Sequence, residues 1–399
     1  MIAKPNLPKP DAVTFQKLML FYSKESLPSS VIELYQSFLV PTLQSHEPAA
    51  LLNNRSYTAS LAIFRHVLTA YESLRMGEKG EEVLDKMVEL GFPATAYDYL
   101  TVMTSYADPT HYSSLDSQAH VTRLFGRMLK QDVKRTVRVY NVVVSVLRRV
   151  GDWARALRYL SAMKMEGIPP DTVTYSAAIS ACVEGKQWEL ALELLGNMEE
   201  ENVTRNVITY NSVIEALDSA GETVRAELVY QSALRSGIYS HWSADEDVQA
   251  DKQLPSVQKM DLHKFPVSVA KSAIMHVLGE MCIGVIPTTT VVVVTGRGNH
   301  LNRDGSRGVL RKELKSFFSE LLGLYWKEDS HNPGRMILER QELLRWMNFQ
   351  RDANQSSGAH SNLFLQVAYA KRKSAPANVR AICPFSGATM DQQHPKTSV

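Results

Sequence analysis

The residues of this sequence whose types and spacing best suit acid–base chemistry are Asp261 and His263. Residues that alternate with the apolar Met260 and Leu262 would lie on one face of a strand. On that face, a carboxylate and an imidazole could orient a water molecule or transfer a proton, which makes both residues catalytic candidates. The same pair could instead brace a neighbouring loop while the domain only binds its ligand.

A glycine-rich segment follows the β-branched run Thr288–Val294. Its members are Thr295, Gly296, Arg297 and Gly298. Glycines directly after a strand allow backbone N–H groups to approach a phosphate closely, and an arginine beside them can neutralise it. Further arginines could extend the anion site: Arg303, Arg307 and Arg311. We therefore expect a loop here that binds a phosphate or nucleic acid.

A second set of polar residues recurs every 35 residues. Each of them directly follows a tyrosine: Tyr140-Asn141, Tyr175-Ser176 and Tyr210-Asn211. Alanines keep the same step: Ala156, Ala191 and Ala226. Apolar residues at helical spacing predict two helices in each unit, and Gly167 and Gly237 suit a left-handed end of the second helix. Such hairpins bury their apolar stripes by stacking, which predicts an α-helical solenoid with a concave groove.

The pattern changes to α/β after an acidic segment. Two helices are predicted, at Val267–Met281 and Val309–Leu322. Strands are predicted near Met260, at Thr288–Val294, at Leu324–Trp326 and at Arg335–Leu338. The predicted fold class is therefore a solenoid of helix hairpins followed by a small α/β domain.

The repeating segment resembles the pentatricopeptide repeat family. Val137–Asp171 (VRVYNVVVSVLRRVGDWARALRYLSAMKMEGIPPD) matches over a whole repeat, from its Tyr-Asn opening to its Gly-Ile-x-Pro-Asp ending. Two further clear copies follow, at 172–206 and 207–241. Weaker copies precede it at 54–93, at 94–136 with an insertion around Asp108–Ser117, and in degenerate form at about 12–44.

This resemblance implies sequence-selective binding of single-stranded RNA, with one base splayed against each repeat. In the family, the fifth and last residues of a repeat touch the base edge, here Asn141 with Asp171, Ser176 with Asn206, and Asn211 with His241. The second residue packs against the base, here Arg138, Val173 and Ile208. By the same resemblance the first two pairs prefer uracil and adenine, which predicts a U-A step read 5′ to 3′ from N- to C-terminus. Taken singly, the polar residues could instead be helix caps.

The C-terminal region is similar to the small MutS-related (Smr) domain. Two motifs carry the resemblance: MDLHKFPVSVA at Met260–Ala270 and VVVVTGRGNH at Val291–His300. Some Smr domains nick DNA or cleave RNA. The resemblance thus implies either an endonuclease with Asp261 and His263 at its centre or a domain that only grips nucleic acid. No cofactor is implied, except a divalent cation if the domain is a nuclease.

The predicted domains follow from these motifs. They are an N-terminal region at 1–53, repeats at 54–241, an acidic linker at 242–256, an Smr domain at 257–344 and a largely disordered tail at 345–399.

Composition restricts the alternatives. The net charge of +2 does not by itself indicate a nucleic-acid partner. The segment from Val121 to Leu160, however, contains ten basic residues and only two acidic ones. These basic residues form either a patch that attracts phosphates or a solvated helix face. The three cysteines are far apart and form no Cys/His cluster, so no metal site is expected. No apolar run approaches the roughly 20 residues that span a bilayer, so no membrane partner is expected.

Three function classes remain from the sequence. The first is an RNA-binding factor in organellar RNA processing or expression, the second a site-specific endonuclease that cuts RNA or nicks DNA, and the third a protein-binding scaffold. Expected partners are single-stranded RNA, DNA as an alternative at the Smr domain, and other organellar expression proteins. The resemblance implies a plastid or mitochondrial location, although the opening MIAKPNLPKP is not typical of a transit peptide.

Overall fold

The computed structural model describes residues 11–41, 57–242, 257–296 and 308–357 of the chain. The chain divides into two compact units, Met1–Ala181 and Cys182–Val399, and each is described by itself. Most of the predicted acidic linker and residues 358–399 of the predicted tail lie outside the described residues. None of the helices in the described ranges combines the length and the apolarity that a bilayer crossing requires.

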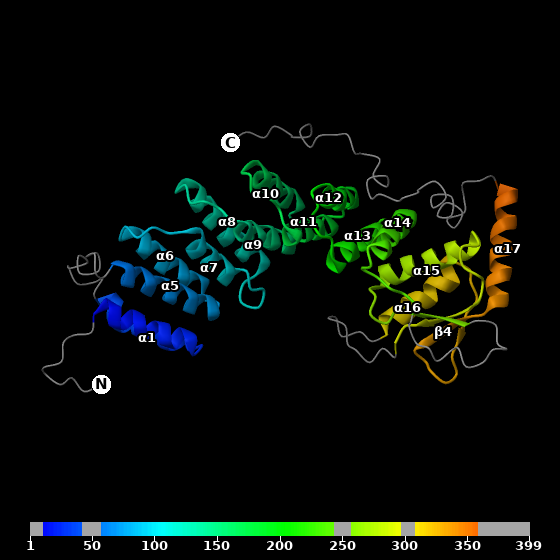
Figure 1. Ribbon diagram of the computed structural model, residues 1–399, viewed down its shortest axis with the longest axis horizontal. Helices are drawn as coiled ribbons and strands as arrows, with labels where there is room; N and C mark the ends of the chain where they lie inside the picture. Colours follow the sequence, from blue (N-terminus) through cyan, green and yellow to red (C-terminus); the bar gives the residue numbers. More distant parts are fainter. Residues whose placement is uncertain (1–10, 42–56, 243–256, 297–307, 358–399) are drawn as a thin grey trace. The chain divides into compact units, whose positions relative to one another are not determined.

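The first unit is built of helix hairpins (Figure 1). In chain order its helices are α1 (Ala12–Lys24), α2 (Pro28–Leu34) with the π-helical turn η1 (Tyr35–Leu39), α5 (Tyr57–Ser73), α6 (Gly77–Glu89), α7 (Ala96–Tyr106), α8 (Ser114–Lys130), α9 (Val137–Arg149), α10 (Trp153–Met165) and the start of α11 (Thr172–Glu184). The first helix of a hairpin packs against both helices of the preceding one, as α7 does on α5 and α6, and α9 on α7 and α8. This is the stacking that the 35-residue step predicts.

A left-handed backbone conformation recurs every 35 residues, at the end of the second helix of a hairpin. Gly167 and Gly237 have φ of 70° and 71°, the left-handed conformation predicted for them. Asp132 and Asn202 take the same conformation at the same step, with φ of 51° and 56°. The hairpin therefore ends at the same place even where the sequence has no glycine.

The tyrosines and alanines that recur at the 35-residue step belong to the core. All of them are buried: Tyr140, Tyr175, Tyr210, Ala156, Ala191 and Ala226. Burying a large apolar side chain stabilises a fold by about 1.5–3 kcal/mol, so the periodic residues account for much of the stability of each hairpin.

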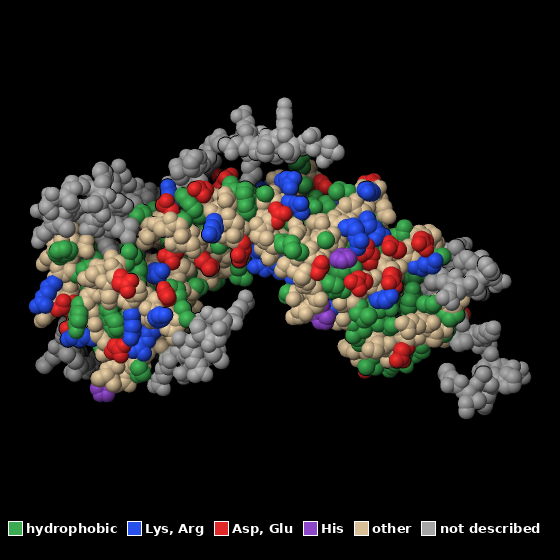
Figure 2. Space-filling view, turned by 180° about the vertical axis from the view of Figure 1, so that it is seen from behind, with side chains coloured by type: hydrophobic (Ala, Val, Ile, Leu, Met, Phe, Trp, Pro, Cys, Tyr) green, Lys and Arg blue, Asp and Glu red, His purple; other side chains and the backbone are tan. Residues whose placement is uncertain are grey.

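An apolar surface lies over the N-terminal helices. Figure 2 shows hydrophobic side chains gathered there, and the exposed ones are Leu18, Leu20, Phe21 and Leu27. Repeat arrays commonly end in a hairpin with a polar outer face. The described first hairpin exposes these four apolar side chains beside charged ones such as Lys17 and Lys24.

Replacing Gly77 by alanine is expected to destabilise the first unit by about 1–3 kcal/mol. The added Cβ would lie 2.7 Å from the ring of Tyr106, which is fully buried and has no space to retreat. Gly126→Ala in α8 is the control, because its Cβ would meet nothing within 4 Å and alanine favours a helix by up to about 1 kcal/mol. Urea unfolding followed by circular dichroism measures both. Equal midpoints for the two variants would contradict this packing.

The second unit combines hairpin helices with a sheet. The helices are α12 (Trp188–Glu200), α13 (Val207–Ser219) and α14 (Thr223–Arg235). In the described residues the sheet has the strand order β1-β2-β4-β3, with β1 (Val257–Asp261), β2 (Thr290–Val294), β4 (Arg335–Leu338) and β3 (Lys327–Glu328). The β1–β2 pair is parallel and is connected through α15 (Val267–Cys282), and the other pairs are antiparallel. The predicted α/β pattern is thus present.

Two details of the α/β part differ from the sequence prediction. The strand expected at Leu324–Trp326 lies at Lys327–Glu328, after α16 (Val309–Ser316) and the π-helical turn η3 (Phe317–Leu321). Helix α17 (Arg340–Ser357) crosses the boundary predicted at residue 344. Its buried Trp346 donates a hydrogen bond from its indole N–H to the Leu322 carbonyl oxygen at 2.7 Å, so this helix belongs to the folded domain.

Helix α15 joins the sheet to the last hairpin. It packs against both α13 and α14, as the first helix of a further hairpin would (Figure 1). At this contact His276 of α15 lies 2.8 Å from Glu227 of α14, Nδ1 to Oε1, and both residues are buried. The Asp261 backbone N–H also donates to the His241 carbonyl oxygen at 2.8 Å. The last hairpin and the α/β part therefore share one core.

Candidate nucleic-acid interface

The first helices of the hairpins share one register, which fixes the side chains that face outward. The second residue is exposed in each: Tyr97 in α7, Arg138 in α9, Val173 in α11 and Ile208 in α13. The third and fourth are buried: Asp98 and Tyr99, Val139 and Tyr140, Thr174 and Tyr175, Thr209 and Tyr210. Because residues three apart share a helix face, the predicted second and fifth residues lie on the same side of each helix.

The last residue of a predicted repeat is the N-cap of the next helix. The Asp171 carboxylate accepts a hydrogen bond from the Thr174 backbone N–H at 2.8 Å, and the Asn206 side chain accepts one from the Thr209 N–H at 2.9 Å. Such caps stabilise a helix by about 1 kcal/mol. Asp171 and Asn206 therefore act as helix caps, the alternative role that the sequence left open. Each cap uses one oxygen of the side chain.

Asn141 and Asp171 contact each other within the first unit. The Asn141 amide Nδ2 donates to the two Asp171 carboxylate oxygens at 3.2 and 3.1 Å. The Thr174 hydroxyl lies 2.5 Å from the Asn141 Oδ1 and 2.9 Å from the Asp171 Oδ1, so the Asn141 oxygen faces the hydroxyl and the amide nitrogen faces the carboxylate. The cluster therefore places an amide N–H and carboxylate oxygens side by side.

The Asp171 carboxylate is held in its ionised form. Burial acts to raise its pKa, but hydrogen bonds from the backbone and hydroxyl of Thr174 and from Asn141 outweigh burial and lower the pKa below its ordinary value. The group therefore adds stability above its ordinary pKa, and this contribution is lost as the pH falls through the lowered pKa. At neutral pH the carboxylate only accepts hydrogen bonds.

The remaining fifth-position residues lie in different surroundings. The Ser176 hydroxyl donates to the Thr172 carbonyl oxygen at 2.6 Å. Its predicted partner Asn206 belongs to the second unit, so that pair remains a prediction of the sequence. In the second unit, Asn211 accepts a hydrogen bond from the Tyr239 hydroxyl at 2.6 Å.

His241 differs from its sequence prediction. Its side chain is only 3% exposed, and its Nδ1 forms a hydrogen bond of 2.8 Å with the Tyr230 hydroxyl. A base cannot reach an imidazole buried in this way. The cause is a long-range contact, because the chain after Tyr239 runs beside β1 and pairs Trp242 with Met260. We therefore leave His241 out of the proposed interface.

Tyr97 is a candidate that the sequence prediction missed. It is 56% exposed and is the second residue of α7, the position that Arg138 holds in α9. The Thr95–Asp98 capping box at the start of this helix was a usable signal. The insertion between α7 and α8 obscured it, because it shifts this hairpin out of the 35-residue step.

The predicted basic patch is partly neutralised. Four of its arginines are ion-paired: Arg123 and Arg127 with Glu81, Arg135 with Glu166, and Arg155 with Asp152. Glu81 and Glu166 lie outside the segment 121–160, so local charge counting did not include them. A helix face with ion pairs therefore describes these four arginines better than a phosphate-binding surface.

Asp261 and His263 come together at the carboxyl end of β1. The His263 Nδ1 donates to the Asp261 Oδ1 at 2.5 Å, and the two side chains are 43% and 35% exposed. Gly296 follows the parallel neighbour β2, and a Cβ on it would lie 3.4 Å from the His263 Cβ. Carboxyl ends of parallel strands are where open α/β sheets bind ligands. The described parts of the two predicted motifs therefore lie side by side.

The other predicted loop residues are engaged or lie outside the described residues. The Thr295 hydroxyl donates to the Gly334 carbonyl oxygen at 3.2 Å. Arg311 forms an ion pair with Glu328 at 2.8 Å, which weakens the attraction of its guanidinium for a phosphate. Arg297 and Gly298 lie outside the described residues. Across the described part of the chain, no group of three or more His, Cys, Asp or Glu side chains could hold a metal ion.

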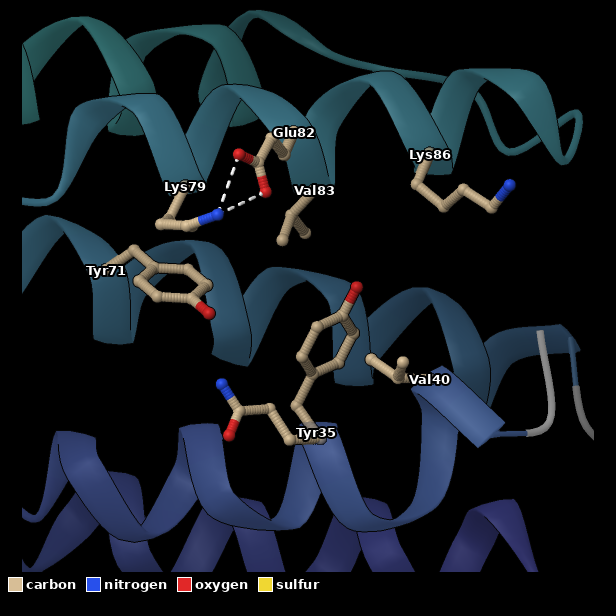
Figure 3. A pocket seen from close by; sticks show the side chains of 8 residues that line it. Tyr35, Val40, Tyr71, Lys79, Glu82, Val83 and Lys86 are labelled. Carbon is tan, nitrogen blue, oxygen red and sulfur yellow. Dashed lines mark hydrogen bonds and ion pairs between the residues drawn. The ribbon is translucent and has the colours of Figure 1, made fainter. Parts of the chain in front are cut away.

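A pocket of about 600 Å³ lies between η1, α5 and α6 in the first unit (Figure 3). Tyr35 reaches across it toward Val83, and Lys79 is ion-paired with Glu82 at 2.8 Å. Burial, with smaller effects of Tyr71 and Glu82, raises the pKa of Tyr35 to about 12, so its hydroxyl stays protonated. No predicted nucleic-acid residue lines this pocket, which is therefore separate from the candidate interface.

Comparisons with solved structures give remote similarities. The PPR domain of Arabidopsis thaliana protein-only RNase P 1 in complex with tRNA is 14% identical, with a TM-score of 0.41 over 47% of this chain and 93% of that chain. The pentatricopeptide repeat protein PPR10 in complex with an 18-nt psaJ RNA element is 16% identical, with a TM-score of 0.41 over 95% of this chain and 57% of that chain. PPR10 from maize is 17% identical, with a TM-score of 0.39 over 95% of this chain and 50% of that chain.

Family comparisons identify the repeats. No curated protein matches the sequence. The family model of the pentatricopeptide repeat domain matches residues 123–185 and 158–219, and that of the PPR repeat matches residues 62–92. These ranges fall on the stacked hairpins. The chain thus contains pentatricopeptide repeats at residues 62–92 and 123–219.

Proposed function

We propose that this chain binds single-stranded RNA along its helix hairpins and selects a base at Asn141 and Asp171. The observation that carries the proposal is the hydrogen-bonded cluster of Asn141, Asp171 and Thr174 at the start of α11. Sequence-specific RNA recognition commonly targets unpaired bases through their Watson–Crick edges. Polar groups held at a helix start can provide such contacts.

The chemistry of this cluster favours uracil. Uracil presents a carbonyl oxygen that accepts a hydrogen bond beside an N3–H that donates one. The Asn141 amide has an N–H for the carbonyl, and the ionised Asp171 can accept from N3–H. Cytosine presents an acceptor at N3, which the carboxylate would repel. A good bidentate contact gives about 1–3 kcal/mol of discrimination between bases.

The exposed second residues supply contacts to the base faces. Arg138 in α9 and Val173 in α11 are exposed on the same side of their helices as the fifth residues. A guanidinium can stack on a base, and an aliphatic side chain can pack against one. Tyr97 extends this row by an aromatic ring, on which any base can stack.

The remaining parts of the proposal rest on the sequence resemblance. Ser176 with Asn206 is the proposed adenine-selecting pair, so the preferred step is U-A. A plastid or mitochondrial location and a role in RNA processing or expression there belong to the same proposal.

For the C-terminal α/β part we propose an Smr-type domain that grips nucleic acid beside Gly296. A second candidate function, an endonuclease, is favoured by one observation. The 2.5 Å hydrogen bond to Asp261 engages Nδ1 of His263, so Nε2 of this half-exposed ring can take part in proton transfer. RNA is the proposed substrate, with DNA as the alternative.

Selection from a random single-stranded RNA pool tests both functions. The full chain is incubated with the pool, and bound and cleaved RNAs are sequenced in parallel with the double variant Asp261→Ala/His263→Ala. We expect enrichment of the U-A step by both proteins. Cleavage by the wild type alone would establish the nuclease, whereas enrichment without cleavage would leave a gripping domain. Failure to bind any single-stranded RNA would favour a protein-binding scaffold.

A further inference from the structure

The last hairpin has the same residue at its base-edge position as the hairpin two repeats earlier, but this residue has a different partner. Asn141 and Asn211 are both the fifth residue of their helices, and their amides would be expected to form equivalent contacts. Asn141 is paired with Asp171, thirty residues further on. The partner of Asn211 is Tyr239, which follows it by 28 residues instead of thirty. The Tyr239 hydroxyl donates a hydrogen bond to the Asn211 Oδ1 at 2.6 Å.

Tyr239 is fixed in place by other aromatic rings. Its ring is stacked on Tyr230 at 5.4 Å between centroids and lies edge-on to Tyr210 at 6.4 Å. Burial, with a smaller effect of Tyr210, raises the pKa of Tyr239 above its ordinary value, so its hydroxyl keeps its proton and donates it. The Asn211 amide oxygen is therefore held by a side chain of the protein itself.

The same tyrosine connects this position to the C-terminal site. The Tyr239 ring contacts Phe265, with 5.5 Å between centroids. Phe265 lies two residues after His263, in the loop between β1 and α15, and its backbone N–H donates to the Leu262 carbonyl oxygen at 2.9 Å. A short chain of contacts thus runs from Asn211 through Tyr239 to the loop that carries His263.

We propose that Tyr239 takes the place of a base-selecting partner in the last hairpin, so that the nucleotide there is held without selection beside the His263 loop. The inference rests on the proposed RNA binding. It makes the last hairpin a spacer that passes the strand from the selective repeats to the Asp261–His263 site. The readable sequence then ends at the pair Ser176 and Asn206.

Binding to four RNAs tests the loss of selection. The RNAs carry U-A-N in a fixed context, with N as each of the four bases, and the dissociation constant for the full chain is measured by fluorescence anisotropy. For the wild type we expect values within about two-fold of one another at N. For Tyr239→Phe, which keeps the ring but removes the donor to Asn211, we expect differences of about five-fold or more, as for a bidentate amide contact. Tyr325→Phe, at an exposed tyrosine, is the control and should behave as the wild type.

The outcomes separate this inference from the proposed function. Absence of U-A enrichment in the selection from the random RNA pool would overturn RNA reading as a whole. Enrichment of U-A in that pool, together with differences of about five-fold or more at N for the wild type, would overturn only the spacer. A flat profile at N in both the wild type and Tyr239→Phe would also overturn it, because Asn211 would then not face a base.

Cross-linking tests the placement beside the loop. RNA with 4-thiouridine at N is irradiated with the full chain, digested with trypsin and analysed by mass spectrometry. We expect adducts on Met260–Lys264 or Phe265–Lys271, the tryptic peptides that contain the loop. Adducts confined to other peptides would overturn the placement.

Discussion

Replacing His276 by alanine is expected to lower the free energy of unfolding of the second unit by about 3–5 kcal/mol. The His276 imidazole lies 2.8 Å from Glu227 through Nδ1 and 3.4 Å from Glu280 through Nε2. His276 and Glu227 are 1% and 0% exposed. Alanine would remove the imidazole from a carboxylate that stays buried, and it would leave a cavity between α14 and α15. Both effects destabilise in the same direction.

Two further variants make the experiment specific. Glu227→Gln keeps a side chain that can hydrogen-bond the imidazole, so we expect a smaller loss than for His276→Ala. His331→Ala removes an imidazole that is 94% exposed and should leave stability unchanged. Urea unfolding of the full chain, followed by tryptophan fluorescence and by circular dichroism, measures all three. A His276→Ala midpoint equal to that of His331→Ala would contradict the buried contact.

This buried contact also bears on function. Elements that share a core tend to open as one cooperative unit, and the buried helix α15 packs against both helices of the last hairpin and against α16 of the α/β part. The loop with His263 leads directly into α15. The position of the His263 loop relative to Asn211 is therefore set by packing inside the second unit. The proposed transfer of an RNA strand from the repeats to this loop requires such a fixed position.

The hairpins were predictable because their signals are local and repeated. Tyr140, Tyr175 and Tyr210 mark the step, and helical periodicity places the residues before and after them on defined faces. The proximity of Asp261 and His263 to Gly296 was likewise predictable, because two parallel strands end at the same edge of a sheet.

The features that the sequence did not predict depend on distant parts of the chain. The burial of His241 follows from its pairing beside β1 and from Tyr230, which no local pattern indicates. The pairing of Arg123 and Arg127 with Glu81 joins neighbouring hairpins. The extension of the fold into α17 depends on one buried face, whose Trp346 donates to Leu322.

Exchanging Asp171 for asparagine is expected to change the preferred base at the first position of the U-A step from uracil toward cytosine. Uracil donates from N3, and the carboxylate accepts, whereas cytosine accepts at N3 and needs a donor, which an amide can supply. We expect the ratio of the dissociation constants for cytosine and uracil to shift by about ten-fold or more, since one good bidentate contact gives about 1–3 kcal/mol. Asparagine caps a helix as well as aspartate does, so α11 should keep its stability.

A matched variant separates base selection from helix capping. Asp11 caps α1 in the same way, because its carboxylate accepts from the Thr14 backbone N–H at 2.8 Å, as Asp171 accepts from Thr174. Asp11→Asn therefore makes the same chemical change at the same kind of helix cap, at a residue that is not one of the proposed base-selecting residues. Titration of both variants with U-A and C-A RNAs measures the selectivity. If Asp171→Asn keeps the uracil preference of the wild type and of Asp11→Asn, Asp171 is a cap alone, and base selection at this hairpin must lie in other side chains.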